Sequence, residues 1–310
     1  MTASVAAGLS GDSGWILTAA TLVVAGLLLA PGWIVGRSAR LAALPSLAVA
    51  PALSSAIIAA AEILAHTLAL PWLPWGWAVI AGLTAVVALM ARLLVGAPPE
   101  RARRAASQGR AEWVILAAGL TVAVAVPAGV ILTVLPGPGY PAQVFDATFH
   151  LNAVAAIREG GNASMLGGLS ALYSGRAVYY PTVWHGAVAL APGSPAPVST
   201  AGVLALTAVV WPLSLLGLLA RATGLDAARA SETDRARRRQ RTCAVAAVLA
   251  LSAAVVGFPL LPMTALAVWP YALSVAGLPG VLVLYDLLRQ ETASWRLRLV
   301  LVLLALAAAG

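Results

Sequence analysis

Hydrophobic residues dominate the chain in long runs of Ala, Leu and Val, which short polar or arginine-rich segments separate. A helix needs about 20 apolar residues to cross a bilayer. Seven runs come close to that length and predict membrane spans at 15–35, 44–66, 75–95, 113–135, 198–220, 242–260 and 268–288. An eighth begins near Leu297 and has only fourteen residues up to and including Gly310. Because that is too short to cross, we expect the sequence to be part of a longer protein.

The segment 136–197 breaks this pattern, since it is far longer than the other predicted connections. It opens with PGPGYP, where Pro and Gly prevent a continued helix. The stretch AQVFDATFHLNAVAAIRE then predicts a helix of about four turns, and the following GGN is typical of a helix end. We expect this helix to lie along the membrane surface. The chain is therefore predicted to be an all-α polytopic bundle, a single transmembrane domain over 1–310 whose outer loop carries a surface helix.

Composition supports a membrane protein and excludes other classes. The chain is 61% hydrophobic and 10% charged, whereas soluble domains are about 45–50% apolar and about 25% charged. The net charge of +8 comes from arginines at the ends of apolar runs, with no aromatic residues interleaved for base stacking. The predicted partner of the apolar runs is the lipid bilayer, and nucleic acid is excluded as a partner.

Arginine placement predicts the orientation of the bundle. Arginines cluster at 36–43, 96–111, 221–241 and 289–296, whereas the alternate connections 67–74 and 261–267 have none. Because basic residues accumulate on the cytoplasmic side, these clusters are predicted to be inside, with the N-terminus outside.

The outer helix carries the first candidate for chemistry. Asp146 and His150 are four residues apart and therefore share a helical face. They are either a hydrogen-bonded pair that anchors the helix, or a carboxylate that serves as general base or metal ligand beside a histidine. His185, in YYPTVWHG, is expected at the same outer face. Glu62 either faces this outer site or caps a helix end.

Further polar residues in the loop are candidates for substrate binding. Arg158 and Arg176 are the only arginines predicted outside, so each requires a partner, either a phosphate or an acid such as Glu159 or Asp146. Tyr179 and Tyr180 offer aromatic faces to a sugar or a prenyl chain. Asn152 shares the polar stretch and is assigned to substrate binding with them.

Charged residues and motifs that the sequence lacks argue against some classes of function. No charged residue falls at the middle of a complete predicted span, whereas ion-coupled transporters usually carry one there. The chain also lacks a phosphate-binding glycine loop, a Gly-x-Ser-x-Gly elbow and a His-Glu-x-x-His motif. A cytoplasmic nucleotide-driven enzyme is therefore not expected.

The apolar helices, the acid on an outer surface helix, and the pairing of FDATFH with YYPTVWH resemble the GT-C superfamily of polyprenyl-phosphate-dependent glycosyltransferases. They are also similar to a group of multi-pass proteins of high-GC bacteria that we associate with that superfamily. The likeness covers the fourth and fifth predicted spans and the loop between them. It implies a multi-pass protein of the bacterial plasma membrane.

The resemblance implies that a sugar passes from a polyprenyl-phosphate donor to an extracytoplasmic acceptor, a cell-envelope glycan or lipid. Asp146 would act as general base beside His150, and Arg158 or Arg176 would stabilise the leaving phosphate. His150 and His185 would bind phosphate or sugar hydroxyls. No cofactor is expected, with a divalent metal on Asp146 and the two histidines as the lesser alternative. The rival functions are a transporter or lipid flippase, and a non-catalytic assembly subunit of the cell envelope.

Overall fold

The computed structural model describes residues 11–95, 109–135, 137–140, 142–225, 232–289, 298–300 and 302–303. Within these ranges the chain is helical and contains no β-strand, which confirms the all-α prediction. Among the described residues, six helices are long and apolar enough to cross a membrane, and the number is seven if a bent helix pair is counted as one span. The eighth predicted run falls largely outside the described residues.

Most of the spans match the predicted runs. The first four are α1 (Gly11–Ser38), α2 (Ala43–Thr67), α3 (Trp72–Val95) and α4 (Arg110–Val134). The fifth is a continuous rod of α7 (Pro195–Leu204), the π-helical turn η4 (Ala205–Val210) and α8 (Trp211–Thr223). The seventh is α11 (Trp269–Leu288).

The sixth span differs from the straight helix predicted at 242–260. Helix α9 (Glu232–Ser252) begins earlier and takes in most of the arginine cluster that we expected to be loop. A bend of 49° then leads to η5 (Val256–Leu260) and α10 (Leu261–Met263). Pro259 lacks an N–H group, and Phe258 before it is extended, with φ −154° and ψ 134°. An α-helix cannot continue through these two residues.

Helix α2 lies at the centre of the packing because small residues let its neighbours approach. A Cβ atom added at Gly32 of α1 would lie 2.2 Å from the Ala50 carbonyl oxygen. The same addition at Gly217 of α8 or at Gly280 of α11 would come within 2.4 or 2.6 Å of the Ala48 backbone. Glycine is therefore required at all three contacts, as is common between membrane helices.

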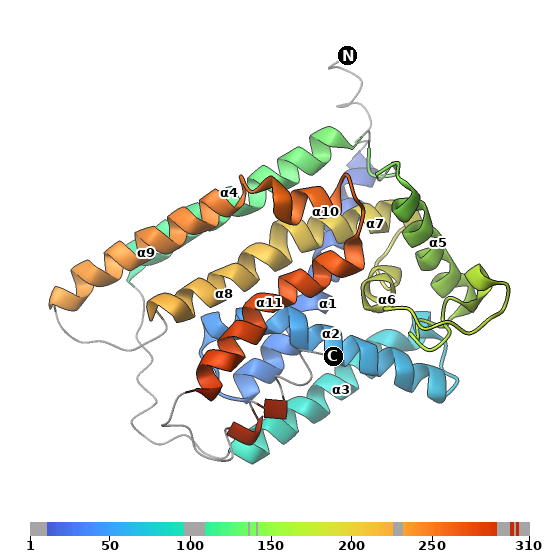
Figure 1. Cartoon of the computed structure of the whole chain (residues 1–310), viewed down its shortest axis with the longest axis horizontal. Coiled ribbons are helices and arrows are strands. Elements are labelled where there is room, and N and C mark those ends of the chain that lie inside the picture. Colours follow the sequence, from blue (N-terminus) through green and yellow to red (C-terminus); the bar gives the residue numbers. More distant parts are fainter. Residues whose placement is uncertain are drawn as a thin grey trace.

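The predicted outer loop forms a folded cap at one end of the bundle. It contains α5 (Phe145–Gly160), the 3₁₀ turn η3 (Ser170–Tyr173) and the short helix α6 (Val183–Ala189). The helix predicted within 142–159 is therefore confirmed. Helix α5 is not among the candidate spans, and Figure 1 shows it lying across the ends of the long helices, with α6 tucked beneath it.

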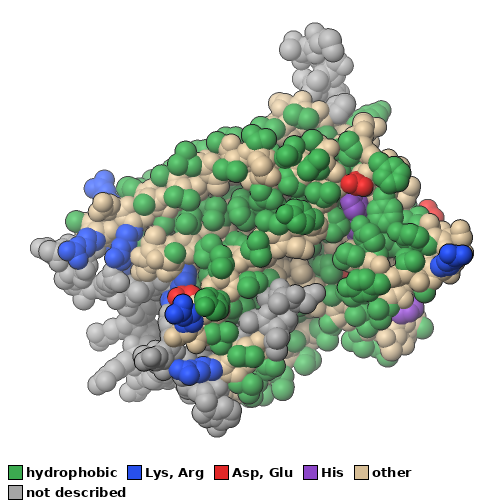
Figure 2. Space-filling view, viewed as in Figure 1, with side chains coloured by type: hydrophobic (Ala, Val, Ile, Leu, Met, Phe, Trp, Pro, Cys, Tyr) green, Lys and Arg blue, Asp and Glu red, His purple; other side chains and the backbone are tan. Residues whose placement is uncertain are grey.

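Positive charge gathers at the other end of the molecule. Figure 2 shows arginine side chains concentrated at the end where α8 stops and α9 starts, opposite the cap formed by α5 and α6 (Figure 1). Ion pairs at this end include Arg221 with Asp286 at 2.8 Å and Arg238 with Glu112 at 3.2 Å. The molecule therefore has two chemically distinct ends.

Candidate functional site

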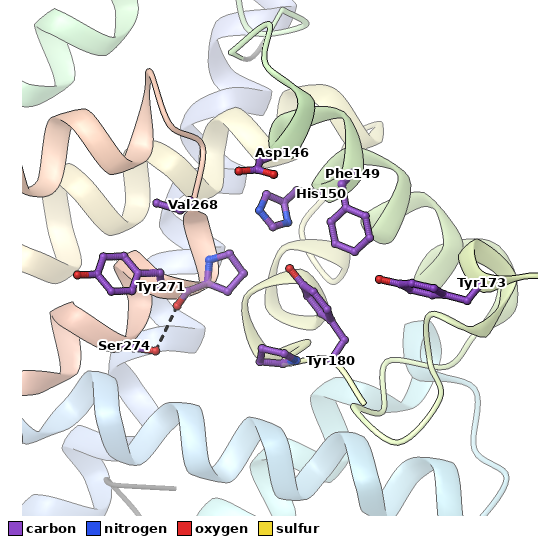
Figure 3. Close-up of a pocket in the computed structure, with 10 residues that line it drawn as sticks. Asp146, Phe149, His150, Tyr173, Tyr180, Val268, Tyr271 and Ser274 are labelled. Atoms are coloured by element: carbon purple, nitrogen blue, oxygen red, sulfur yellow. Dashed lines mark hydrogen bonds between the residues drawn. The ribbon is translucent and has the colours of Figure 1, made fainter. Parts of the chain in front are cut away.

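A cavity of about 530 Å³ lies between α5, the segment 173–181 and the start of α11. Figure 3 shows Asp146, Phe149 and His150 on one side, with Tyr180 and Tyr271 reaching the same space from other elements. Its walls are formed by Asp146, Phe149, His150, Tyr173, Tyr180, Pro181, Val268, Pro270, Tyr271 and Ser274. Because α11 is a candidate span and α5 is not, the cavity lies between the cap and the bundle of candidate spans.

The pattern of buried residues in α5 decides which of its side chains reach the cavity. Its buried positions recur every three or four residues and form one stripe: Ala147, His150, Ala153, Val154 and Ile157. Asp146 and Phe149 border that stripe, so they line the cavity beside His150. Gly161 ends the helix in the left-handed conformation, with φ 66°, and its N–H donates to the Ile157 carbonyl at 2.9 Å.

His150 and His185 are in direct contact. His150 Nδ1 lies 2.8 Å from His185 Nε2, so one ring donates a hydrogen bond to the other. His185 belongs to α6, in which every residue after Val183 is buried. The ring centroids of Trp184 and Trp269 lie 6.2 and 5.1 Å from that of His150. The pair is therefore enclosed by aromatic side chains.

Burial keeps both rings neutral. It lowers the pKa of His150 to about 4, although the charge of Asp146 and the carbonyl of Ala267 act in the opposite direction. Burial also lowers the pKa of His185 well below its usual value, and a positive charge on His150 would lower it further. At neutral pH each ring thus has one nitrogen that can accept a proton.

Tyrosines give the cavity aromatic faces and hydroxyl groups. The rings of Phe149 and Tyr180 have centroids 5.1 Å apart. Burial, and then the nearby Tyr173 and Asp146, raise the pKa of Tyr180, so its hydroxyl remains a hydrogen-bond donor. Asp146 is the one acidic side chain among the ten lining residues, and none of the ten is Arg or Lys. The wall therefore offers one carboxylate and several hydroxyl groups, and no cationic side chain.

Arg158 lies apart from the cavity and binds backbone instead of either acid that the sequence suggested. Its Nε donates to the Ala189 carbonyl at 3.1 Å, and its two terminal nitrogens donate to the carbonyls of Ala191 and Gly193. These carbonyls belong to the last residue of α6 and to the chain that follows it. Arg158 therefore fastens α5 to the chain that leaves α6.

Three other predicted residues are not part of the cavity wall. Asn152 and Arg176 are exposed, and the side chain of Tyr179 is 71% exposed. The backbone N–H of Arg176 donates to the Tyr173 carbonyl at 3.0 Å, so Arg176 follows a lining residue without lining the cavity itself. The structure thus brings together Asp146, His150 and Tyr180, with His185 directly behind them.

Glu62 faces the segment that carries His185. Its side chain is buried, and Oε2 accepts a 2.9 Å hydrogen bond from the Thr182 hydroxyl at the start of α6. Oε1 has no hydrogen-bond partner and lies where a Cβ atom on Gly186 would be only 1.9 Å away. The Trp72 Nε1–H donates to the Gly186 carbonyl at 2.9 Å. Glu62 therefore contacts one residue that precedes His185 in the chain, Thr182, and one that follows it, Gly186.

The lesser alternative of a metal on Asp146, His150 and His185 fits poorly. His150 Nδ1 and His185 Nε2 are hydrogen-bonded to each other, so these two nitrogens are not available as metal ligands. Within the part of the chain that the structure describes, no group of three or more His, Cys, Asp or Glu side chains is arranged to hold a metal ion.

Sequence reasoning missed Tyr173, Tyr271 and Ser274. Tyr271 and Ser274 are three residues apart in the first turns of α11, which places both on one helical face. The opening Trp-Pro-Tyr of that helix was a usable signal, because the predicted topology puts it at the same outer end as α5. Which face of α11 meets α5 depends on how the bundle packs.

The fold and site define a multi-pass membrane protein with a cavity at one end of its helix bundle. The chain belongs to DUF6541, a family of unknown function whose model matches residues 25–310. No curated protein and no solved structure matches it.

Proposed function

We propose that this protein is a membrane glycosyltransferase that moves a sugar from a polyprenyl-phosphate donor to an extracytoplasmic acceptor. One observation carries the proposal: the carboxylate of Asp146 lines a cavity whose opposite wall, Tyr271 and Ser274, belongs to a candidate membrane span. A lipid-linked substrate has its reacting group at this boundary. The resemblance of FDATFH and YYPTVWH to GT-C enzymes supports the same assignment.

In this proposal Asp146 is the general base. Its carboxylate accepts the proton of an acceptor hydroxyl while the hydroxyl oxygen attacks the anomeric carbon, and the configuration at that carbon inverts. The bond from that carbon to the lipid phosphate breaks, and the phosphate leaves with the electron pair. The faces of Phe149 and Tyr180 stack on the sugar ring, since aromatic rings pack well on apolar sugar faces.

The leaving phosphate requires hydrogen-bond donors, because the cavity wall has no Arg or Lys. The hydroxyl groups of Tyr180 and Tyr271 are the donors that the wall offers, since the Ser274 hydroxyl donates to the Pro270 carbonyl at 3.3 Å. Arg158 is engaged with three carbonyls, so the proposal assigns it to structure rather than to phosphate. Arg176, exposed beyond Tyr173, remains a candidate contact for the donor phosphate outside the wall.

A transporter or lipid flippase is the second candidate, and Glu62 is the observation that favours it. Glu62 is a buried acid within the candidate span Ala43–Thr67, and acids within spans commonly mark transport pathways. In that case Glu62, rather than Asp146, would be the essential carboxylate.

The deciding experiment compares Asp146→Asn with Glu159→Gln in the full chain, reconstituted in lipid vesicles with a polyprenyl-phosphate hexose labelled in the sugar. Asp146→Asn keeps the shape but removes the base, and should reduce transfer by about 10²–10⁴-fold. Glu159 lies exposed on the same helix outside the cavity, so Glu159→Gln should match wild type. Wild-type transfer by Asp146→Asn would overturn the proposal. Loss of lipid movement in Glu62→Gln alone would establish the transporter instead.

A further inference from the structure

The first turns of α9 carry arginines that the rest of the structure leaves without an acidic partner. Arg238 turns toward α4, where its Nε lies 3.2 Å from Glu112 Oε2. In the part of the chain that the structure describes, no ion pair joins Arg237, Arg239 or Arg241 to an acid. These three charges therefore do not join α9 to another helix, and they are available to a ligand.

The packing of α9 against α4 decides which way these arginines point. The described side chains of α9 that are buried share one face: Thr242, Val245, Ala246 and Leu249. That face meets α4 closely, since a Cβ atom added at Gly119 would lie 2.5 Å from the Ala246 carbonyl oxygen. Arg237 and Arg241 are four residues apart beside this face, so their side chains lie one above the other along the helix. Arg239 lies between them in the sequence and points to the opposite side of α9.

An apolar strip continues from the two arginines along the same face of α9. Ala244 and Val248 follow Arg241 by three and seven residues, which keeps them on that face, and Leu251 borders them. All three are exposed, Val248 at 43% and Leu251 at 67%. From Arg241 to Leu251 the helix rises about 15 Å, which is half of a hydrocarbon core of about 30 Å. The 49° bend of the sixth span follows directly. The strip is therefore as long as one leaflet of a bilayer is deep.

Trp113 places the arginines at the depth of lipid headgroups. It directly follows Glu112, the partner of Arg238, and 49% of its surface is exposed. Exposed tryptophans of spanning helices gather at the boundary between lipid and water. Arg237 and Arg241 lie on either side of Arg238 in α9, so their guanidinium groups reach the same boundary as the Trp113 ring.

Orientation of the chain in the membrane does not require this arrangement. Basic residues set topology by their number near the ends of a span, whichever face of a helix carries them. Arg237 and Arg241 share one face with the apolar strip, whereas Arg239 does not. A charged pair followed by an apolar strip one leaflet long matches the shape of a single phospholipid.

We propose that Arg237 and Arg241 bind the phosphate of an anionic phospholipid in the leaflet at the arginine-rich end, and that one of its acyl chains lies along Ala244, Val248 and Leu251. Two guanidinium groups one turn apart offer several N–H donors to a single phosphate. A zwitterionic lipid would bring its own cationic group next to them, whereas an anionic lipid such as phosphatidylglycerol brings none. This site lies at the end opposite the cavity, and it does not depend on the proposed function.

Native mass spectrometry of the full chain in detergent measures the binding of phosphatidylglycerol directly. Wild type should retain this lipid and should bind phosphatidylcholine more weakly. Arg237→Gln and Arg241→Gln should each weaken the binding about fivefold, the factor expected for one basic residue at an anionic lipid. Arg239→Gln removes the same charge from the other side of the helix and should match wild type. Equal binding of the two lipids, or an equal loss in all three variants, would overturn the site, because net charge or hydrophobicity alone would then explain the binding.

Competition tests whether the acyl chain contributes. Glycerol phosphate carries the charged group without chains, so at equal concentration it should not displace the bound phosphatidylglycerol. Displacement would show that the arginines bind phosphate alone, and the strip would then have no part in binding. The same spectra count the protein chains in each particle. A two-chain species that Arg241→Gln abolishes would assign this face to a second copy of the protein and would refute the lipid site.

Discussion

The hydroxyl of Thr182 donates a 2.9 Å hydrogen bond to Glu62 Oε2, although 120 residues separate them in the chain. This bond ties a membrane-spanning helix, α2, to the first residues of α6. Four residues further on, Gly186 packs against the other oxygen of the same carboxylate. The position of His185, and through it that of His150, depends on this junction.

Gly186→Ala should destabilise the protein, because its Cβ would lie 1.9 Å from Glu62 Oε1. Overpacking of this kind costs about 1–3 kcal/mol. The measurement is the free energy of unfolding in detergent. Gly129→Ala in α4 is the control, since nothing lies within 4 Å of the added atom. The double variant Gly186→Ala with Glu62→Ala should lose less than the sum of the single losses, and strict additivity would show that the two residues do not clash.

Arg158→Lys should reduce stability rather than donor affinity. The guanidinium group serves three carbonyls from three different nitrogens, and an ammonium group cannot reproduce that geometry. Hydrogen bonds to a charged group contribute about 1.5–3 kcal/mol, so unfolding should become easier by an amount in that range. Arg176→Lys, at an exposed position, is the control. Unchanged stability together with a raised KM for the donor would instead assign Arg158 to phosphate binding.

The fold should lose stability as the pH falls from about 6.5 toward 4. In the folded protein burial lowers the pKa of His150 to about 4, whereas an unfolded histidine has a pKa of about 6.5. Between these values the unfolded chain binds more protons, so the free energy of unfolding rises with pH. His185 shifts in the same direction. The contribution of His150 is on the order of a few kcal/mol and is fully present above about pH 6.5, and His185 adds to it in the same direction.

Thermal unfolding at about pH 5 and about pH 7.5 measures this dependence. Wild type and His66→Gln should both unfold more easily at the lower pH. The double variant His150→Gln with His185→Gln should show a smaller difference between the two conditions. An equally large difference in the double variant would mean that other groups cause it.

The arginine-rich end of the bundle should face the cytoplasm, with the cap of α5 and α6 outside. Single cysteines at Ala171 and Gln240, both exposed and at opposite ends of the predicted topology, report on the two sides after Cys243→Ser removes the natural thiol. A maleimide that cannot cross membranes should label Ala171→Cys in intact cells and Gln240→Cys only after lysis. Labelling of Gln240→Cys from outside would reverse the orientation.

The sequence alone determined the class of this protein, most of its spans and the helix α5 of the cap. These features are local: runs of about 20 apolar residues demand a helix in lipid, and the pattern from Phe145 to Gly161 encodes both a helix and its end. The sequence also placed Asp146 and His150 on one face, because four residues make about one helical turn.

Tertiary structure decided everything that joins distant segments. It paired His150 with His185, turned Tyr271 and Ser274 of α11 toward α5, and buried Glu62 against Thr182. It also engaged Arg158 with backbone carbonyls, and bent the sixth span by 49° between Ser252 and Val256, ahead of the non-helical Phe258. These contacts depend on which helix faces meet, and in this bundle that choice follows from close packing at small residues around Ala48 and Ala50 of α2. Runs of Ala, Leu and Val look alike on every side, so their hydrophobic pattern cannot specify those faces.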